Sequence, residues 1–177
     1  VCEKTPQYVF YLKEIFNLYP NAKVINMVRD PRAILLSQKN KWNRRNLGSE
    51  YMTKKEAFRL RINYHQITLS KLWNAAINAA NLFKEEIRVI SVRFEDLLEN
   101  PETILQPVCK HIEVEFDKNM LNITQESSSL EKDSKEIGFK KERASNWKLG
   151  GLNMTERWIC QSMCAENMQQ YKFEQEK

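Results

Sequence analysis

Glycine is scarce in this sequence, which contains only Gly48, Gly138, Gly150 and Gly151. None of the four belongs to a glycine-rich loop of the kind that surrounds nucleotide phosphates, and the GxxxxGK[ST] pattern does not occur. The GxSxG turn that presents the nucleophile of α/β-hydrolases is also missing. The sequence therefore carries neither the phosphate-binding loop of P-loop proteins nor the nucleophile turn of α/β-hydrolases.

Metal-ligand spacing and long apolar runs are missing as well. The two histidines and four cysteines form no CxxC or Cys/His zinc pattern, so we expect no metal site. We expect free, buried thiols, and we interpret His65 as an ordinary core or surface histidine. No run of 18 apolar residues predicts a membrane-spanning helix within this sequence. The cysteines are Cys2, Cys109, Cys160 and Cys164, and the histidines are His65 and His111.

The charge is mildly basic and evenly distributed. The 177 residues, enough for one domain, carry a formal net charge of +5. This excess suits an anionic ligand. A nucleic-acid binder usually concentrates its basic residues, so we expect no nucleic acid partner. The one dense basic run, Lys39 to Arg45, is interpreted as a solvated loop.

The most informative stretch is KVINMVRDPRAILLS, from Lys23 to Ser37. The apolar run Val24 to Val28 predicts a strand. Asp30 is a good helix N-cap and Pro31 suits the first helical position, so a tight turn should lead into a helix. Arg29 would then lie at the carboxyl end of a strand, where open α/β sheets bind ligands. An arginine close to a helix N-terminus offers a forked cation to phosphate or sulfate.

The remaining pattern predicts an α/β fold with a parallel sheet flanked by helices. A second strand is expected at Ile87 to Phe94. Between Thr53 and Phe83, one long helix or two helices joined at a bend both fit the periodicity, and Thr53 with Glu56 forms a capping-box pattern. The other expected elements are helices from about Tyr8 to Tyr19, from Pro31 to about Lys41, from Pro101 and from about Thr155 to Tyr171, a loop at Asn46 to Ser49, and a mobile loop at Ser127 to Glu136.

Cations stand out in three segments: Lys4, Arg29 with Ser37, and Lys141 with Arg143. Together these cations could bind a dianionic group and a second group that is being transferred. Taken singly, each also has a plain structural interpretation. A lysine beside a turn is commonly just exposed, and the Arg-Asp-Pro turn could be a surface corner with an internal Arg–Asp pair.

Four segments in this order resemble the sulfotransferases that use 3′-phosphoadenosine 5′-phosphosulfate (PAPS). They are EKTP (Glu3 to Pro6), VRDPRAILLS (Val28 to Ser37), VRFEDLLENP (Val92 to Pro101) and a basic stretch ending in NWK (Asn146 to Lys148). The resemblance, which runs over nearly the whole chain, implies a fold related to the P-loop nucleotide kinases. It also implies transfer of a sulfuryl group to an acceptor hydroxyl, with PAPS as co-substrate.

The resemblance implies roles for the cationic residues. Arg29 and Ser37 match the family's pair that binds the 3′-phosphate of PAPS. Phe94 matches the aromatic residue near the adenine, although cytosolic members have Tyr there. Lys141 and Arg143 are the nearest candidates for the basic loop that closes on the 3′-phosphate, but the Arg-Lys-Gly form of the cytosolic enzymes is absent. Lys4 corresponds to a lysine near the transferred sulfuryl group.

Other parts of the reaction are less defined. An acceptor-activating base is needed, and Glu3 is available. The acceptor is expected to be a carbohydrate hydroxyl, then a lipid or small-molecule alcohol, then tyrosine. The oligomeric state is left open. We expect a cytoplasmic protein, or a Golgi-lumenal one if a membrane anchor lies upstream.

The family's 5′-phosphosulfate loop, which should precede EKTP, does not occur in this sequence. We therefore expect residues 1–177 to form a single domain that is incomplete at its N-terminus and poorly active. Two other functions remain open. One is a non-catalytic module that binds an anionic ligand or glycan, and the other is a nucleotide kinase-like enzyme.

Overall fold

The computed structural model describes residues 2–47, 53–122 and 138–175. It divides into two compact units. Unit 1 comprises Val1–Val28 and Phe83–Ala144, and unit 2 comprises Arg29–Leu82 and Ser145–Lys177. The single domain expected over residues 1–177 stays a prediction.

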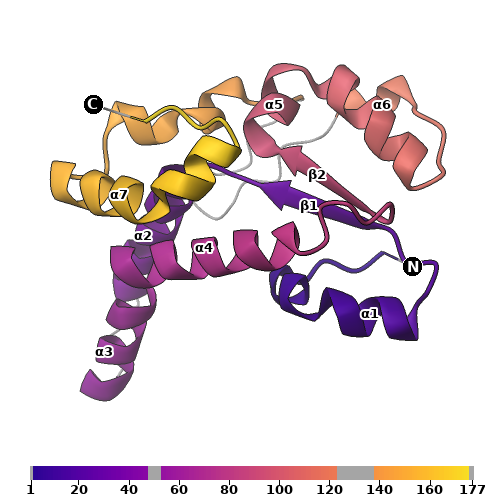
Figure 1. Ribbon diagram of the computed structural model, residues 1–177. Coiled ribbons are helices and arrows are strands. Elements are labelled where there is room, and N and C mark those ends of the chain that lie inside the picture. Colours follow the sequence, from indigo (N-terminus) through magenta and orange to yellow (C-terminus); the bar gives the residue numbers. More distant parts are fainter. Residues whose placement is uncertain (1, 48–52, 123–137, 176–177) are drawn as a thin grey trace. The chain divides into compact units, whose positions relative to one another are not determined.

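Among the described residues of unit 1, two parallel strands pair with each other, β1 (Val24–Val28) and β2 (Val89–Arg93), which lie side by side in Figure 1. Val24 pairs with Val89 and Val28 with Arg93. The sequence prediction of β1 is confirmed, whereas β2 is shorter than expected. Helix α5 begins at Phe94, so this residue does not belong to the strand. The helical elements of unit 1 are η1 (Pro6–Tyr11), α1 (Leu12–Leu18), α5 (Phe94–Glu99), α6 (Pro101–His111), η2 (Lys118–Leu121) and η3 (Lys141–Ala144).

The core of unit 1 is partly aromatic. In α1, Leu12 and Phe16 are buried, and the expected helix from Tyr8 to Tyr19 begins with 3-10 rather than α-helical turns. The ring of Phe16 meets that of Phe83 edge-on, with centroids 5.9 Å apart. Arg88 lies 3.9 Å over the Phe16 ring and forms a 2.9 Å ion pair with Glu86. This arrangement fixes the chain where it enters β2.

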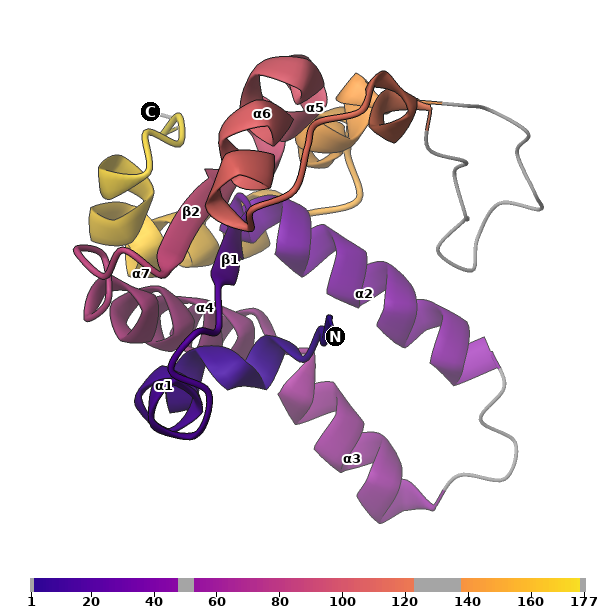
Figure 2. The same cartoon turned by 90° about the vertical axis from the view of Figure 1, so that its right-hand side faces the viewer.

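Unit 2 is helical. Its elements are α2 (Pro31–Leu47), α3 (Lys54–Asn63), α4 (Gln66–Asn81), η4 (Asn146–Leu149) and α7 (Met154–Gln170). Helices α4 and α7 lie side by side (Figures 1 and 2). Their buried side chains include Trp73, Ile77, Ala80, Cys160, Cys164 and Met168.

The region from Thr53 to Phe83 forms two main helices, because the chain breaks at His65. The His65 side chain caps α4 by accepting a 3.3 Å hydrogen bond from the Ile67 amide. His65 is exposed, which agrees with a structural role. The predicted capping box at the start of α3 is confirmed: Thr53 N donates to Glu56 Oε2 over 3.0 Å, and Glu56 N donates to Thr53 Oγ1 over 3.3 Å.

Two loop predictions near the basic run are wrong. Helix α2 continues to Leu47, so the run Lys39 to Arg45 is helical rather than a loop, and the helix does not end near Lys41. The helix continues because this run contains neither glycine nor proline. Its Lys and Arg residues, and Gln38 before it, are good helix formers. Of the expected loop Asn46 to Ser49, the first two residues belong to α2, and the others lie outside the described residues. The expected loop Ser127 to Glu136 also lies outside the described residues.

Candidate functional site

The turn after β1 is built by its own side chains. Asp30 caps α2 by accepting a 2.8 Å hydrogen bond from the Arg32 amide through Oδ1. Pro31 follows as the first residue of the helix, and the Ile34 amide donates to the Asp30 carbonyl over 3.1 Å. The predicted strand, tight turn and helix are therefore confirmed.

Arg32 is the residue that sequence reasoning missed. Its side chain is 1% exposed and forms a two-pronged ion pair with Asp30: Nε to Oδ1 over 3.0 Å and Nη2 to Oδ2 over 2.7 Å. The internal Arg–Asp pair considered for this turn thus exists, but with Arg32 as the arginine. The pair cancels one positive and one negative charge, so residues 29–32 keep a net charge of +1 from Arg29.

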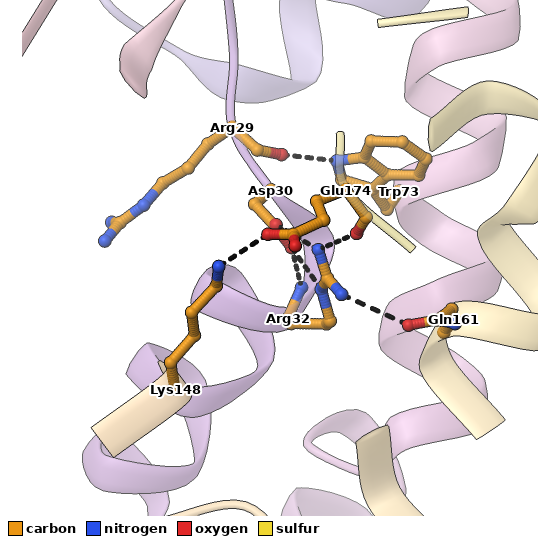
Figure 3. A network of polar contacts seen from close by, with 7 residues as sticks. All are labelled: Arg29, Asp30, Arg32, Trp73, Lys148, Gln161 and Glu174. Carbon is orange, nitrogen blue, oxygen red and sulfur yellow. Dashed lines mark hydrogen bonds and ion pairs between the residues drawn. The ribbon is translucent and has the colours of Figure 1, made fainter. Parts of the chain in front are cut away.

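The other donors of Arg32 tie the turn to distant parts of unit 2, as Figure 3 shows. Nη1 donates to Gln161 Oε1 over 3.1 Å, and Nη2 donates to the Glu174 carbonyl oxygen over 2.6 Å. The guanidinium also lies 3.7 Å from the centre of the buried Trp147 ring. Lys148 adds a 2.6 Å ion pair to the Glu174 carboxylate, and this contact holds the pKa of Glu174 below its usual value.

Arg29 lies at the edge of this network. Its carbonyl oxygen accepts a 3.0 Å hydrogen bond from Trp73 Nε1, and its side chain points away from the Asp30–Arg32 pair (Figure 3). The side chain is half-buried. The predicted partner Ser37 is exposed and belongs to α2 in the same unit. It lies about 9 Å along the helix axis from Pro31 at 1.5 Å per residue.

The other predicted site residues belong to unit 1. Lys4 is exposed and precedes Thr5, whose backbone is extended. Thr5 Oγ1 donates a 2.8 Å hydrogen bond to Glu3, the candidate base.

Two predicted donor-site segments are brought together within unit 1. Phe94 is half-buried at the start of α5, and η3 packs against α5 (Figure 2). Lys141 and Arg143 both belong to η3, where Lys141 is exposed and Arg143 is half-buried. This packing therefore places the element that carries the aromatic candidate next to the element that carries the basic candidates, although the two are far apart in the sequence.

The thiols lie outside this set of residues. All four cysteines are free, and the expected burial is confirmed for all but the exposed Cys2. Cys160 and Cys164 interact in the core of unit 2, which lowers the pKa of the first thiol and raises that of the second. Within residues 2–47, 53–122 and 138–175, no cluster of three or more His, Cys, Asp or Glu residues is suited to a metal ion. In the same ranges, every helix is too short or too polar to cross a membrane.

Comparison with known proteins identifies related sequences. The model of the sulfotransferase family matches residues 1–118. A Caenorhabditis briggsae protein named "Putative protein-tyrosine sulfotransferase" is 28% identical over 122 residues, which cover 69% of this chain and 40% of that protein. The chain therefore spans less than half the length of this curated relative.

Two solved structures share the fold at 18% sequence identity. The sulfotransferase domain from the curacin biosynthetic pathway superposes with a TM-score of 0.62 over 98% of this chain and 62% of that domain. The sulfotransferase domain of the Synechococcus PCC 7002 olefin synthase gives a TM-score of 0.66, covering 98% of this chain and 58% of that domain. These similarities confirm the predicted α/β fold with a parallel sheet.

Proposed function

The chain belongs to the sulfotransferase family, and on this premise we propose that it transfers a sulfuryl group from PAPS to an acceptor hydroxyl. Because the chain spans only part of its relatives, the activity, the donor and the acceptor are all part of the proposal.

The observation that carries the proposal is the turn after β1. It presents Arg29 at the carboxyl end of a parallel strand, next to a capped helix whose own acidic residue, Asp30, is already paired with Arg32. A guanidinium can bind a phosphate through two parallel hydrogen bonds. We assign Arg29 to the 3′-phosphate of PAPS, and the hydroxyl of Ser37 to the same group.

Residues of unit 1 receive roles in the same proposal. Lys4 would compensate the charge that develops on the bridging oxygen as the nucleotide leaves. Phe94 would stack on the adenine, and Lys141 and Arg143 would add positive charge at the 3′-phosphate. Their packing on neighbouring elements supports assigning Phe94 and η3 to one end of the donor.

The reaction would be an in-line transfer, in which positioning and charge compensation lower the barrier. The acceptor oxygen forms a bond to sulfur while the bond from sulfur to the bridging phosphate oxygen breaks. Adenosine 3′,5′-bisphosphate leaves with the bridging electron pair, and the acceptor proton passes to a base. Glu3 is the candidate base, and its hydrogen bond with Thr5 supports a defined orientation of the carboxylate.

We propose a carbohydrate hydroxyl as the acceptor, with tyrosine and small-molecule alcohols as the other candidates. The name of the C. briggsae relative refers to tyrosine, which favours testing that acceptor beside the sugars.

A transfer assay with ³⁵S-labelled PAPS tests the proposal. Labelled product should form with at least one member of a panel of glycans, tyrosine peptides and simple alcohols. It should fall at least about tenfold with Lys4→Ala, because charge stabilisation in a transition state contributes on this scale. Lys71→Ala, an exposed lysine of α4, is the matched control and should leave the rate unchanged. Donor binding without transfer to any acceptor would favour the non-catalytic module.

A further inference from the structure

We propose that Trp73 is a positioning residue for Arg29, and that it acts together with Arg32 to hold the turn after β1 in the geometry that binds the donor. This inference rests on the proposed function, because it concerns the same donor site. It adds to that function two residues that do not themselves contact the donor.

The contact of Trp73 is directed at the backbone of the functional residue. Trp73 is 7% exposed, and its Nε1 donates to the carbonyl oxygen of Arg29 over 3.0 Å (Figure 3). That carbonyl belongs to the peptide plane between Arg29 and Asp30. Fixing this plane limits the backbone rotation of Arg29 and hence the direction in which its side chain leaves the chain.

The indole of Trp73 is itself held in place. The ring of Phe173, 6% exposed, packs against it with centroids 6.4 Å apart. Since rigid aromatic packing leaves the indole N–H few alternative directions, the hydrogen bond to Arg29 is maintained by the core of unit 2.

Arg32 holds Asp30, the residue that follows the same peptide bond. The Arg32 guanidinium forms two hydrogen bonds to the Asp30 carboxylate, and it also donates to Gln161 of α7 and to the carbonyl oxygen of Glu174. A lysine could not replace this planar fork, because a single ammonium group cannot reproduce the paired geometry or the stacking on Trp147. Arg29 and Asp30 are thus fixed by separate contacts to α4, to α7 and to the C-terminal residues.

Fixing the backbone of Arg29 and Asp30 matters because phosphate binding by a guanidinium depends on its orientation. A displacement of about 1 Å can lower a reaction rate by about two orders of magnitude. In this arrangement, Trp73 contributes to the donor site through Arg29 rather than by contact with the donor. The two residues should therefore be coupled energetically.

A double-mutant cycle tests this coupling. The affinity for adenosine 3′,5′-bisphosphate is measured by isothermal titration for the unsubstituted chain, Arg29→Ala, Trp73→Phe and the double variant. Phe keeps an aromatic ring but removes the indole N–H. We expect Trp73→Phe to weaken binding, and the effect of Arg29→Ala to be about three- to tenfold smaller in the Trp73→Phe background.

Trp158→Phe is the matched control, because Trp158 is 68% exposed and lies in the same unit. It should change neither the affinity nor the effect of Arg29→Ala. A second readout follows the indole N–H resonances: that of Trp73 should shift when the ligand binds, and that of Trp158 should not. Arg32→Lys should behave like Trp73→Phe in the cycle.

The outcomes separate the two proposals. If the unsubstituted chain does not bind the ligand, or Arg29→Ala leaves binding unchanged, the proposed function is wrong. If Arg29→Ala weakens binding by the same factor in both backgrounds, the donor site stands and the positioning role of Trp73 is rejected. Thermal melting shows that each variant is folded before titration. Should Trp73→Phe unfold the chain, the same cycle is measured with Arg32→Lys, together with the Trp73 resonance of the unsubstituted chain. Equal effects of Arg29→Ala in both backgrounds and an unshifted Trp73 resonance would reject the positioning role.

Discussion

At the scale of single residues, the turn after β1 depends on a buried ion pair in which every guanidinium nitrogen donates at least one hydrogen bond. Removing two charges from water is costly, and the cost is offset only when the remaining donors and acceptors are satisfied. Arg32 meets this condition through Asp30, Gln161 and the Glu174 carbonyl. Sequence reasoning predicts the Asp30 cap but not the importance of Arg32, because the burial of its side chain depends on contacts with residues far away in the sequence. Its place two residues after an N-cap aspartate was the available signal.

Breaking the pair from one side should be strongly destabilising. Arg32→Met leaves the Asp30 carboxylate buried without its main partner, so we expect the free energy of unfolding to fall by about 3–5 kcal/mol. Urea denaturation measures this change. Lys39→Met is the control, because Lys39 and Glu156 form a more exposed pair whose loss should cost about 1 kcal/mol or less. Equal losses for the two variants would contradict the structural role of Arg32.

The acid side of the stability profile should depend on Glu86. The hydrogen bond and charge of Arg88 hold the pKa of Glu86 below its ordinary value of 4.5. A carboxylate with a lowered folded-state pKa adds stability above the ordinary value, and this stability is lost as the pH falls through the folded-state pKa. Melting temperatures between pH 7 and pH 3 should therefore fall less steeply below pH 4.5 for Glu86→Gln than for the unsubstituted chain.

The control for this pH dependence is Glu85→Gln, since the side chain of Glu85 is 88% exposed. It should reproduce the profile of the unsubstituted chain. A profile for Glu86→Gln that is equally steep would show that the contact with Arg88 does not stabilise the folded state.

At the scale of elements, local capping explains where several helices begin. The capping box before α3 is predicted by the spacing of Thr53 and Glu56. The structure shows a second capping box before α7, formed by Asn153 and Glu156. The periodicity does not locate the break before α4, because the segment contains neither glycine nor proline and His65 caps the helix only through the orientation of its side chain. The sequence pattern predicts too short an α2, since the polar second half of this helix has no apolar periodicity.

The capping box of α7 gives a test at this scale. Asn153 accepts a 2.8 Å hydrogen bond from the Glu156 amide, and its own amide donates to Glu156 Oε2 over 2.8 Å. Asn153→Ala should lower the free energy of unfolding by about 1 kcal/mol, while Asn153→Asp should nearly preserve it. Equal stabilities for the Ala and Asp variants in urea denaturation would contradict the role of this cap.

At the scale of the whole molecule, the order of segments identified the family, and the fold followed from it. The strand that leads to Arg29 could be predicted because Val and Ile form a short run that ends at a helix-capping pair. The neighbourhood of Phe94 and η3 could not be derived from local patterns, because it depends on packing between segments more than forty residues apart in the sequence. Likewise, Trp73 and Gln161 are linked to the turn only by the tertiary fold.

The central claim is that Arg29 and Ser37 bind the 3′-phosphate of the donor. The most direct measurement compares the affinity for adenosine 3′,5′-bisphosphate with that for adenosine 5′-monophosphate, which lacks the 3′-phosphate. Charge-assisted hydrogen bonds contribute about 1.5–3 kcal/mol, so the unsubstituted chain should prefer the bisphosphate by at least about tenfold. Arg29→Ala should remove most of this preference and Ser37→Ala part of it, whereas Arg59→Ala, at an exposed position of α3, should retain it. A preference that is unchanged in Arg29→Ala would contradict the account.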